Sequence, residues 1–184
     1  MQARAILASL PLFTLLACAT PRPALPLQPP SAACVGYVQE QEGLREVPDP
    51  ELLRQALGFP GKGSLCTARV FEAVRPVTVY RVWNKAKPYT QLGRWWSFAA
   101  PKGPVAEYRR DNAICPEWSA LDVVSACKLK VGARVVVGPG QSAECKDGTY
   151  PASATNQVFV PNDTRDPAKP SVHVEACTEG APWP

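Results

Sequence analysis

Alternating and β-branched stretches in the second half of the chain predict several short strands. The clearest is Val77–Trp83, in which β-branched and aromatic residues occupy most positions. Arg94–Phe98 has a similar composition, and Gly132 separates two further apolar runs. The predicted strands are 65–70, 77–83, 94–98, 127–131, 133–137, 157–160 and 171–176, with a loop over 84–92 and a turn at 138–140.

Helix signals lie in the first two thirds of the chain. Asp49 is placed to cap a helix, and Pro50 suits its first position. The predicted helices are 48–58, 104–112 and 116–124. Strands outnumber helices, so we predict an α+β fold: a small domain with short helices and a split, antiparallel-rich sheet, and not a doubly wound sheet.

The N-terminus has the pattern of an export signal. Arg4 is the only charge before an apolar run over 5–16, which is too short to span a bilayer as a helix. The run ends in Leu15-Leu16-Ala17-Cys18, which resembles the bacterial lipobox, whose cysteine is lipidated and becomes the new N-terminus. In lipoproteins an aspartate after that cysteine favours the inner membrane; here Ala19 follows, so the resemblance implies the outer membrane. An ordinary signal peptide with a chance cysteine is the alternative.

Lipidation of Cys18 would leave six of the seven cysteines for the exported domain. An even number in an exported chain predicts three disulfides, which can pair in many ways. We favour pairing of neighbours in sequence: Cys34–Cys66, Cys115–Cys127 and Cys145–Cys177. There is no CxxC pair and a single histidine, so no metal site is expected. That histidine, His173, is either a base or, more simply, a hydrogen-bonded structural residue.

These signals divide the chain into four parts. Residues 1–17 form the signal peptide, and 18–33 form the lipidated N-terminus with a proline-rich spacer of extended character. An N-terminal helical lobe is expected over 34–75, and a core with a C-terminal tail over 76–184. The folded part has the size of one domain.

Charge and common motifs exclude several functions. The net charge of +4 is weak and dispersed, so no nucleic-acid partner is expected. Arg109 and Arg110 are expected on a solvated face. The sequence contains no phosphate-binding glycine loop, serine nucleophile elbow or metal-ligand cluster. Chemistry must therefore come from separated segments.

Three such segments remain, with two shorter ones between the second and the third. They are Val79–Trp83, Gly93–Phe98 and Asn156–Pro161, with Tyr108–Ala113 and Pro116–Ser119 between. Together they resemble the ADP-ribosyltransferase-like domains of bacterial polymorphic toxins, especially the NAD-glycohydrolase toxins. In that group a tyrosine–arginine strand, a tryptophan–serine strand and a late glutamine strand form the NAD site. The resemblance covers about Val77–Pro161.

The resemblance implies a role for each matched residue. Arg81 would bind the pyrophosphate of NAD, because a guanidinium forks onto phosphate oxygens and stays charged. Trp95 or Trp96 would stack on the nicotinamide or wall the pocket; they point to opposite faces of a strand, so one belongs to the core. Ser97 would orient the ribose or the amide, and Gln157 would hold a ribose hydroxyl and position water.

Gln157 stands where the transferases have a glutamate. An amide cannot supply the negative charge that an oxocarbenium-like ribose calls for, so the resemblance favours NAD hydrolysis over transfer to a protein. Glu144 is the nearest carboxylate in sequence that would compensate. Read without the resemblance, Arg81 pairs as readily with a carboxylate such as Asp111 or Glu107, and Gln157 is a surface residue.

Two functions are therefore expected as alternatives. The first is a lipid-anchored toxin or effector that cleaves the nicotinamide–ribose bond of NAD; NAD is then substrate, and the membrane and an immunity protein are partners. The second is a non-enzymatic outer-membrane lipoprotein that acts as a binding or structural module. Convergence of Arg81, Ser97 and Gln157 on one cleft would favour the first.

Overall fold

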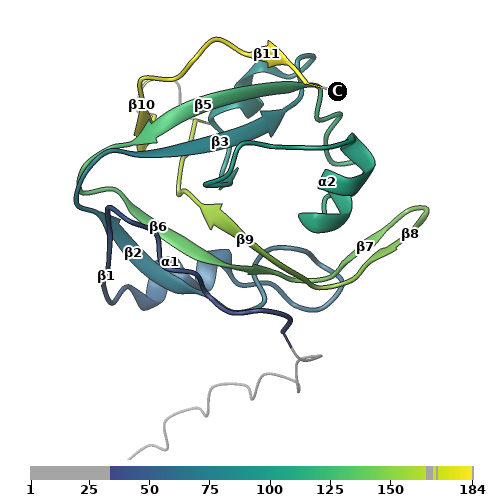
Figure 1. Ribbon diagram of the computed structural model, residues 1–184, viewed down its shortest axis with the longest axis horizontal. Coiled ribbons are helices and arrows are strands. Elements are labelled where there is room, and N and C mark those ends of the chain that lie inside the picture. Colours follow the sequence, from purple (N-terminus) through teal and green to yellow (C-terminus); the bar gives the residue numbers. More distant parts are fainter. Residues whose placement is uncertain (1–33, 165–167, 169, 184) are drawn as a thin grey trace, which may run out of the picture.

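The computed structural model describes residues 34–164, 168 and 170–183. These residues form two main antiparallel sheets that pack face to face, with two short α-helices (Figure 1). The prediction of a small, mostly antiparallel α+β domain is therefore confirmed. The predicted signal peptide, the lipidation of Cys18 and the spacer up to residue 33 lie outside the described residues. No helix in the described part of the chain is long and apolar enough to cross a membrane.

The first sheet has five strands in the order β1-β2-β6-β9-β4. They are β1 (Leu44–Glu46), β2 (Arg69–Ala73), β6 (Arg134–Gly140), β9 (Ser153–Phe159) and β4 (Trp95–Trp96). All neighbouring pairs are antiparallel. Because β2 lies between β1 and β6, the segments 34–75 and 76–184 contribute to the same sheet.

The second sheet is built around β5 (Val123–Leu129). β3 (Val77–Trp83) pairs with it along its whole length, and β10 (Val174–Glu175) and β11 (Ala181–Pro182) also pair with it. The chain joins the two sheets at a corner: Trp96 pairs with β9, and the next residue, Ser97, bridges Tyr80 of β3. Backbone bonds of 2.8 and 2.9 Å in both directions hold that bridge.

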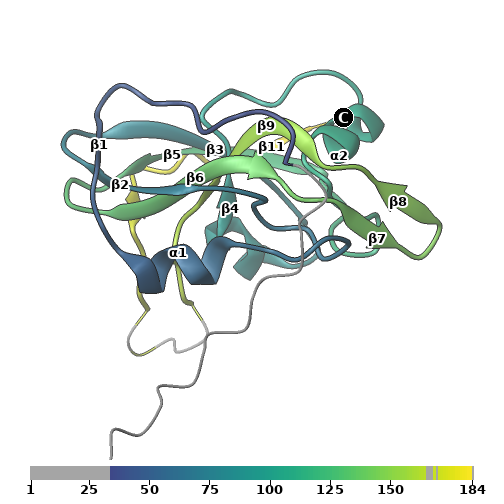
Figure 2. The same cartoon turned by 90° about the horizontal axis from the view of Figure 1, so that it is seen from below.

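The strand pattern of β6 explains how both faces of the first sheet are covered. Val135 and Val137 face the second sheet, while Val136 belongs to a separate apolar cluster with Leu52 and Ala56 of the helix α1 (Pro50–Ala56). All three valines are fully buried, as expected for a strand with an element packed on each side. Figure 2 shows α1 alongside β2 and β6.

Two of the predicted helices are confirmed. α1 (Pro50–Ala56) begins after Asp49, whose Oδ1 accepts the backbone N–H of Leu52 at 3.0 Å. This bond, with a smaller effect of Arg134, lowers the pKa of the Asp49 carboxyl. α2 (Val105–Asp111) fills the predicted segment 104–112. The predicted loop 84–92 contains the 3-10 helix η1 (Pro88–Leu92), and the hairpin of β7 (Ala143–Cys145) and β8 (Gly148–Tyr150) extends from the end of β6 (Figure 1).

The predicted helix 116–124 is wrong. β5 already begins at Val123, and Leu121 has a φ of 57°, which no right-handed helix accepts. The carbonyls of Ser119 and Ala120 accept hydrogen bonds from Arg109 instead, at 2.6 and 3.0 Å. A contact with a distant side chain therefore replaces the backbone bonds of a helix.

The predicted turn at 138–140 is also wrong, since these residues form the last part of β6. Gly138 lies against the backbone of Thr67: a Cβ atom at 138 would lie 1.9 Å from the Thr67 carbonyl oxygen. Glycine occupies this position because of a close backbone approach, and not because the chain turns.

Three disulfides are present, as predicted, but only one of the preferred pairings is right. Cys34–Cys66 is confirmed, whereas the other bonds are Cys115–Cys145 and Cys127–Cys177. Cys127 lies on β5, to whose edge the C-terminal segment returns, so its partner is Cys177. Cys115 lies before β5, against the hairpin that carries Cys145. The sheet topology, and not the sequence spacing, sets the partners.

Chymotryptic digestion of the unreduced full-length chain tests this pairing, because cleavage after Trp118 or Leu121 separates Cys115 from Cys127. Mass spectrometry should find Cys115 linked to Cys145 and Cys127 linked to Cys177. Replacing both Cys127 and Cys177 by alanine should lower the free energy of unfolding by about 2–4 kcal/mol, mainly through a less restricted unfolded chain. A peptide linking Cys115 to Cys127 would contradict the observed topology.

Candidate functional site

A cavity of about 360 Å³ lies where β3, β4 and β9 meet the segment 112–121. Its lining residues are Lys62, Ser64, Arg81, Val82, Trp95, Gln157, Asn112, Ala113, Ile114, Trp118, Ser119 and Leu121. Half of them belong to 112–121, which has no regular secondary structure. We call this the Arg81 cavity. It brings together three residues that the sequence singled out from three separate strands.

Arg81 is the most buried charge at this cavity. Its Nε donates to the carbonyl of Thr90 at 2.6 Å, and its Nη1 donates to the carbonyl of Trp95 at 2.5 Å. Burial lowers the pKa of Arg81 to about 10, and the nearby Tyr108 opposes this shift. A Cβ atom at position 93 would lie 2.2 Å from Nη2, so Gly93 makes room for the guanidinium.

Among the described residues no carboxylate pairs with Arg81. The acidic partners considered from the sequence lie elsewhere: Asp111 is 3.9 Å from Arg110, and Glu107 lies beside Gly103. With a pKa of about 10 the guanidinium keeps its charge at neutral pH. Its hydrogen bonds go to carbonyl oxygens, and its Cζ lies 6.0 Å from the centroid of the Trp96 ring.

The side chains of the two adjacent tryptophans point to opposite faces of β4, as successive residues of a strand do. Trp95 is half-buried, lines the cavity and packs edge-on against Phe159, with ring centroids 5.2 Å apart. Trp96 is 3% exposed, lies in the core between the sheets and donates its Nε1–H to the carbonyl of Gly93 at 2.8 Å. Trp95 is thus the wall residue of the pair.

Gln157 is buried beside the segment 112–121. Its Nε2 donates to the carbonyl of Asn112 at 3.0 Å. The absence of a side chain at Gly140 leaves room for it, since a Cβ atom there would lie 2.8 Å from Nε2. Gln157 therefore holds one end of the cavity wall as well as lining the cavity.

Ser97 and Glu144 do not join this group. The Ser97 hydroxyl donates to the carbonyl of Ala99 at 2.8 Å, and Ser97 lines a different hollow. Glu144 is exposed on β7 and lies next to Gly61. The structure therefore gathers Arg81, Trp95 and Gln157 and leaves out Trp96, Ser97 and Glu144.

Arg109 secures the wall of the cavity. Its guanidinium donates to the carbonyls of four residues of the segment 112–121, of which the first and third line the cavity: Ile114, Cys115, Ser119 and Ala120. The disulfide from Cys115 ties the same segment to β7. The expectation of a solvated Arg109 is therefore wrong, because the side chain is 9% exposed. Only the fold of 112–121 around it, which no local pattern encodes, could reveal this.

The lining of the cavity carries positive charge alone. Lys62 is exposed and Arg81 is half-buried, and no aspartate or glutamate lines the cavity. Trp118 is 49% exposed and forms part of the lining. Two cations, two indole rings and several amide and hydroxyl groups can bind an anion that carries a flat ring.

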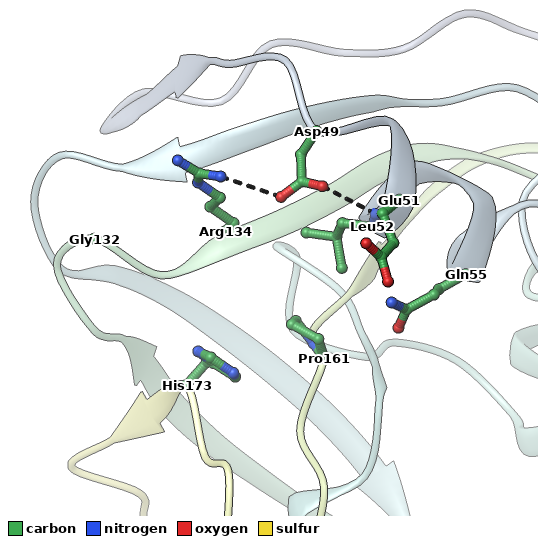
Figure 3. A pocket seen from close by; sticks show the side chains of 8 residues that line it. All are labelled: Asp49, Glu51, Leu52, Gln55, Gly132, Arg134, Pro161 and His173. Carbon is green, nitrogen blue, oxygen red and sulfur yellow. Dashed lines mark hydrogen bonds and ion pairs between the residues drawn. The ribbon is translucent and has the colours of Figure 1, made fainter.

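A second hollow, of about 370 Å³, contains the single histidine (Figure 3). His173 Nε2 lies 3.0 Å from the Ser171 hydroxyl, and its backbone N–H donates to Asn162 Oδ1 at 2.8 Å. Burial, and secondly Lys130, lowers its pKa. The carboxylate of Asp49 in this hollow is bonded to Leu52 and Arg134, as the dashed lines show.

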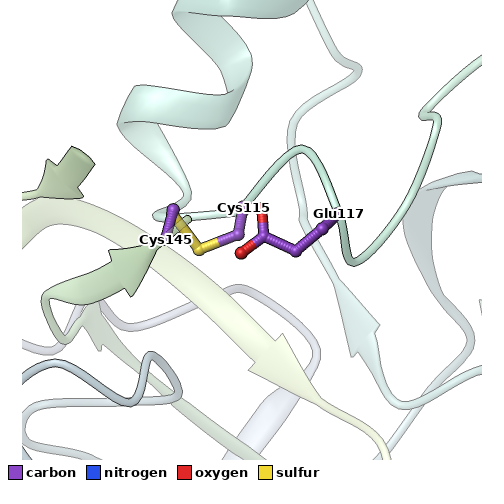
Figure 4. Close-up of side chains that lie close together, drawn as sticks. All are labelled: Cys115, Glu117 and Cys145. Carbon is purple, nitrogen blue, oxygen red and sulfur yellow. A yellow bond between two sulfur atoms is a disulfide. The ribbon is translucent and has the colours of Figure 1, made fainter. Parts of the chain in front are cut away.

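Three residues of metal-binding type also come close together. The ligand atoms of Cys115, Glu117 and Cys145 lie within 4.8 Å of one another (Figure 4). The two sulfur atoms are joined in a disulfide and offer no thiolate, and Glu117 Oε1 accepts the backbone N–H of Lys146 at 3.0 Å. The group is therefore a disulfide next to a hydrogen-bonded carboxylate, and it lacks the ligand set of a metal centre.

Comparison with known proteins found no matching family model, no similar curated protein and no similar solved structure.

Arg81→Ala should destabilise the domain, because the carbonyls of Thr90 and Trp95 would lose their donors and the guanidinium space would be empty. We expect a loss of about 2–4 kcal/mol in the free energy of unfolding, measured by chemical denaturation. Arg75→Ala is the matched control, since Arg75 pairs at the surface with Glu42 and should cost at most about 1 kcal/mol. Equal losses for the two variants would contradict this account of Arg81.

Proposed function

We propose that this chain is a binding module, tethered in the cell envelope, that holds an anionic small ligand in the Arg81 cavity. The observation that carries the proposal is the pair of cations, Lys62 and Arg81, in a lining without a carboxylate. A desolvated guanidinium without an acidic partner gains most from an incoming anion, because the attraction is strong where water is excluded.

The remaining lining narrows the class of anion. Trp95 and Trp118 offer apolar faces for a planar ring, and Gln157 and Ser119 offer polar contacts. A volume of about 360 Å³ lies in the range of small-molecule sites. A nucleoside phosphate combines the two features, with phosphate near the cations and base near the indoles.

Binding is better supported than catalysis. Cleavage of a glycosidic bond to ribose passes through a cationic sugar that a nearby carboxylate stabilises. The lining of the Arg81 cavity contains none, and Glu144, which the sequence offered as compensation, lies outside it. Two positive side chains facing a developing positive charge would raise its energy.

Isothermal titration of the full-length chain with AMP tests the proposal. We expect saturable binding that weakens by about tenfold in Lys62→Ala, in line with the loss of one charge-assisted contact. Lys62 is exposed, so this variant should fold normally. Lys102→Ala is the matched control, since Lys102 is exposed and outside the cavity.

Adenosine should bind more weakly than AMP, because it lacks the anion. Within the Lys62→Ala variant, AMP affinity should stay constant through neutral pH and fall as the pH rises through about 10, where Arg81 loses its proton. Burial raises the pKa of the nearby Tyr108 phenol, so Tyr108 stays neutral over the pH range in which Arg81 loses its proton. Equal affinity for AMP and adenosine, or no AMP binding, would remove the proposal.

NAD cleavage is the second candidate, and one observation favours it: Arg81, Trp95 and Gln157 come from three distant strands and line one cavity. The full-length chain should then release nicotinamide from NAD, detected by chromatography. Arg81→Lys, which keeps the charge but loses the fork, should reduce the release at least about tenfold, and Lys102→Ala should not. Folded protein that binds AMP but releases no nicotinamide would leave the binding function alone.

A further inference from the structure

A hollow of about 390 Å³ shares no lining residue with the Arg81 cavity. It is formed by the segment 39–41 near the start of the domain, the segment 97–99 after β4, and Thr155 with Asn156 of β9. Ser97, which the sequence grouped with Arg81, belongs to this hollow. We call it the amide hollow.

The chemistry of the amide hollow is the opposite of that of the Arg81 cavity. Its lining contains no lysine, arginine or histidine. Three side-chain amides, from Gln39, Gln41 and Asn156, accompany two hydroxyl side chains and the carboxylate of Glu40. An amide both donates and accepts hydrogen bonds, so this set suits a neutral ligand rich in hydroxyl groups.

Asn156 fixes the shape of the hollow. Its Oδ1 accepts the backbone N–H of Gln39 at 3.0 Å, and its Nδ2 donates to the carbonyls of Tyr37 and Ala154 at 2.9 and 3.3 Å. The contact is tight nearby: a Cβ atom at Gly36 would lie 2.9 Å from Ala154. One wall is therefore held in place before a ligand arrives.

The side-chain amides of Gln39 and Gln41, in contrast, make no hydrogen bond with the residues that the structure describes, so they are available to a ligand. One aromatic ring lines the hollow, that of the half-buried Phe98. Tyr37 is 74% exposed and comes two residues before the lining segment 39–41, and its carbonyl accepts a hydrogen bond from Asn156. An aromatic ring next to amides provides an apolar face beside polar groups.

We propose that the amide hollow binds a neutral saccharide. Vicinal hydroxyls of a sugar ring would bond to the amides of Gln39 and Gln41 and to Glu40, and the C–H face of the ring would lie against Tyr37 or Phe98. No cation lines the hollow, and the carboxylate of Glu40 already lies 3.7 Å from the guanidinium of Arg69, so the lining offers no partner for the charge of an anionic sugar. This inference does not depend on what occupies the Arg81 cavity.

Titration calorimetry of the full-length chain with tri-N-acetylchitotriose, maltotriose and trigalacturonic acid tests the proposal. At least one of the two neutral sugars should bind saturably, and the anionic sugar should bind more weakly than it. Gln41→Ala and Tyr37→Ala should each weaken the neutral sugar by about tenfold, the scale of one lost hydrogen bond or ring contact.

Tyr89→Ala is the control for loss of an exposed ring, because Tyr89 is 69% exposed on η1 and outside the hollow. It should leave sugar affinity unchanged, and so should Lys62→Ala at the other cavity. Absence of saturable binding by both neutral sugars, equal affinity for trigalacturonic acid, or affinity that survives both Gln41→Ala and Tyr37→Ala would overturn the proposal. AMP binding measured on the same variants tests the Arg81 cavity alone, because the two hollows share no lining residue.

Discussion

The buried guanidinium of Arg81 is the constraint on which the corner between the two sheets depends. It bonds to the carbonyls of Thr90 and Trp95, while its neighbour Tyr80 bridges to Ser97. A single strand therefore both closes the corner and places a cation at a cavity. No carboxylate among the described residues pairs with it, and this is the basis of the proposed anion site.

The segment 112–121, which supplies half of the lining residues, is held by contacts between distant parts of the chain. Arg109 bonds to four carbonyls of 112–121, Gln157 bonds to its first carbonyl, and a disulfide joins Cys115 to β7. This explains how a segment without helix or strand can line a defined cavity. The same bonds stabilise the fold and shape the candidate site, so a substitution that removes one of them should affect both.

The two proposals rest on hollows of different chemistry. The Arg81 cavity has cations and indoles without carboxylates, and the amide hollow has amides and one carboxylate without cations. The resemblance to NAD-cleaving toxins predicted Arg81, Ser97 and Gln157 in one site. Arg81 and Gln157 line one cavity, but Ser97 lines the amide hollow, because the chain passes from the first sheet to the second directly after β4.

The sequence by itself determined the elements whose signals are local. Val77–Trp83 is a strand because its β-branched and aromatic residues favour the extended chain, and α1 begins at Pro50 because Asp49 caps it. Tertiary structure alone decided that Trp95 and not Trp96 lines the cavity, that Arg109 is buried, that 116–124 is no helix and that Cys127 bonds to Cys177. Each of these depends on contacts between residues far apart in the chain, whose energies no local pattern of residues records.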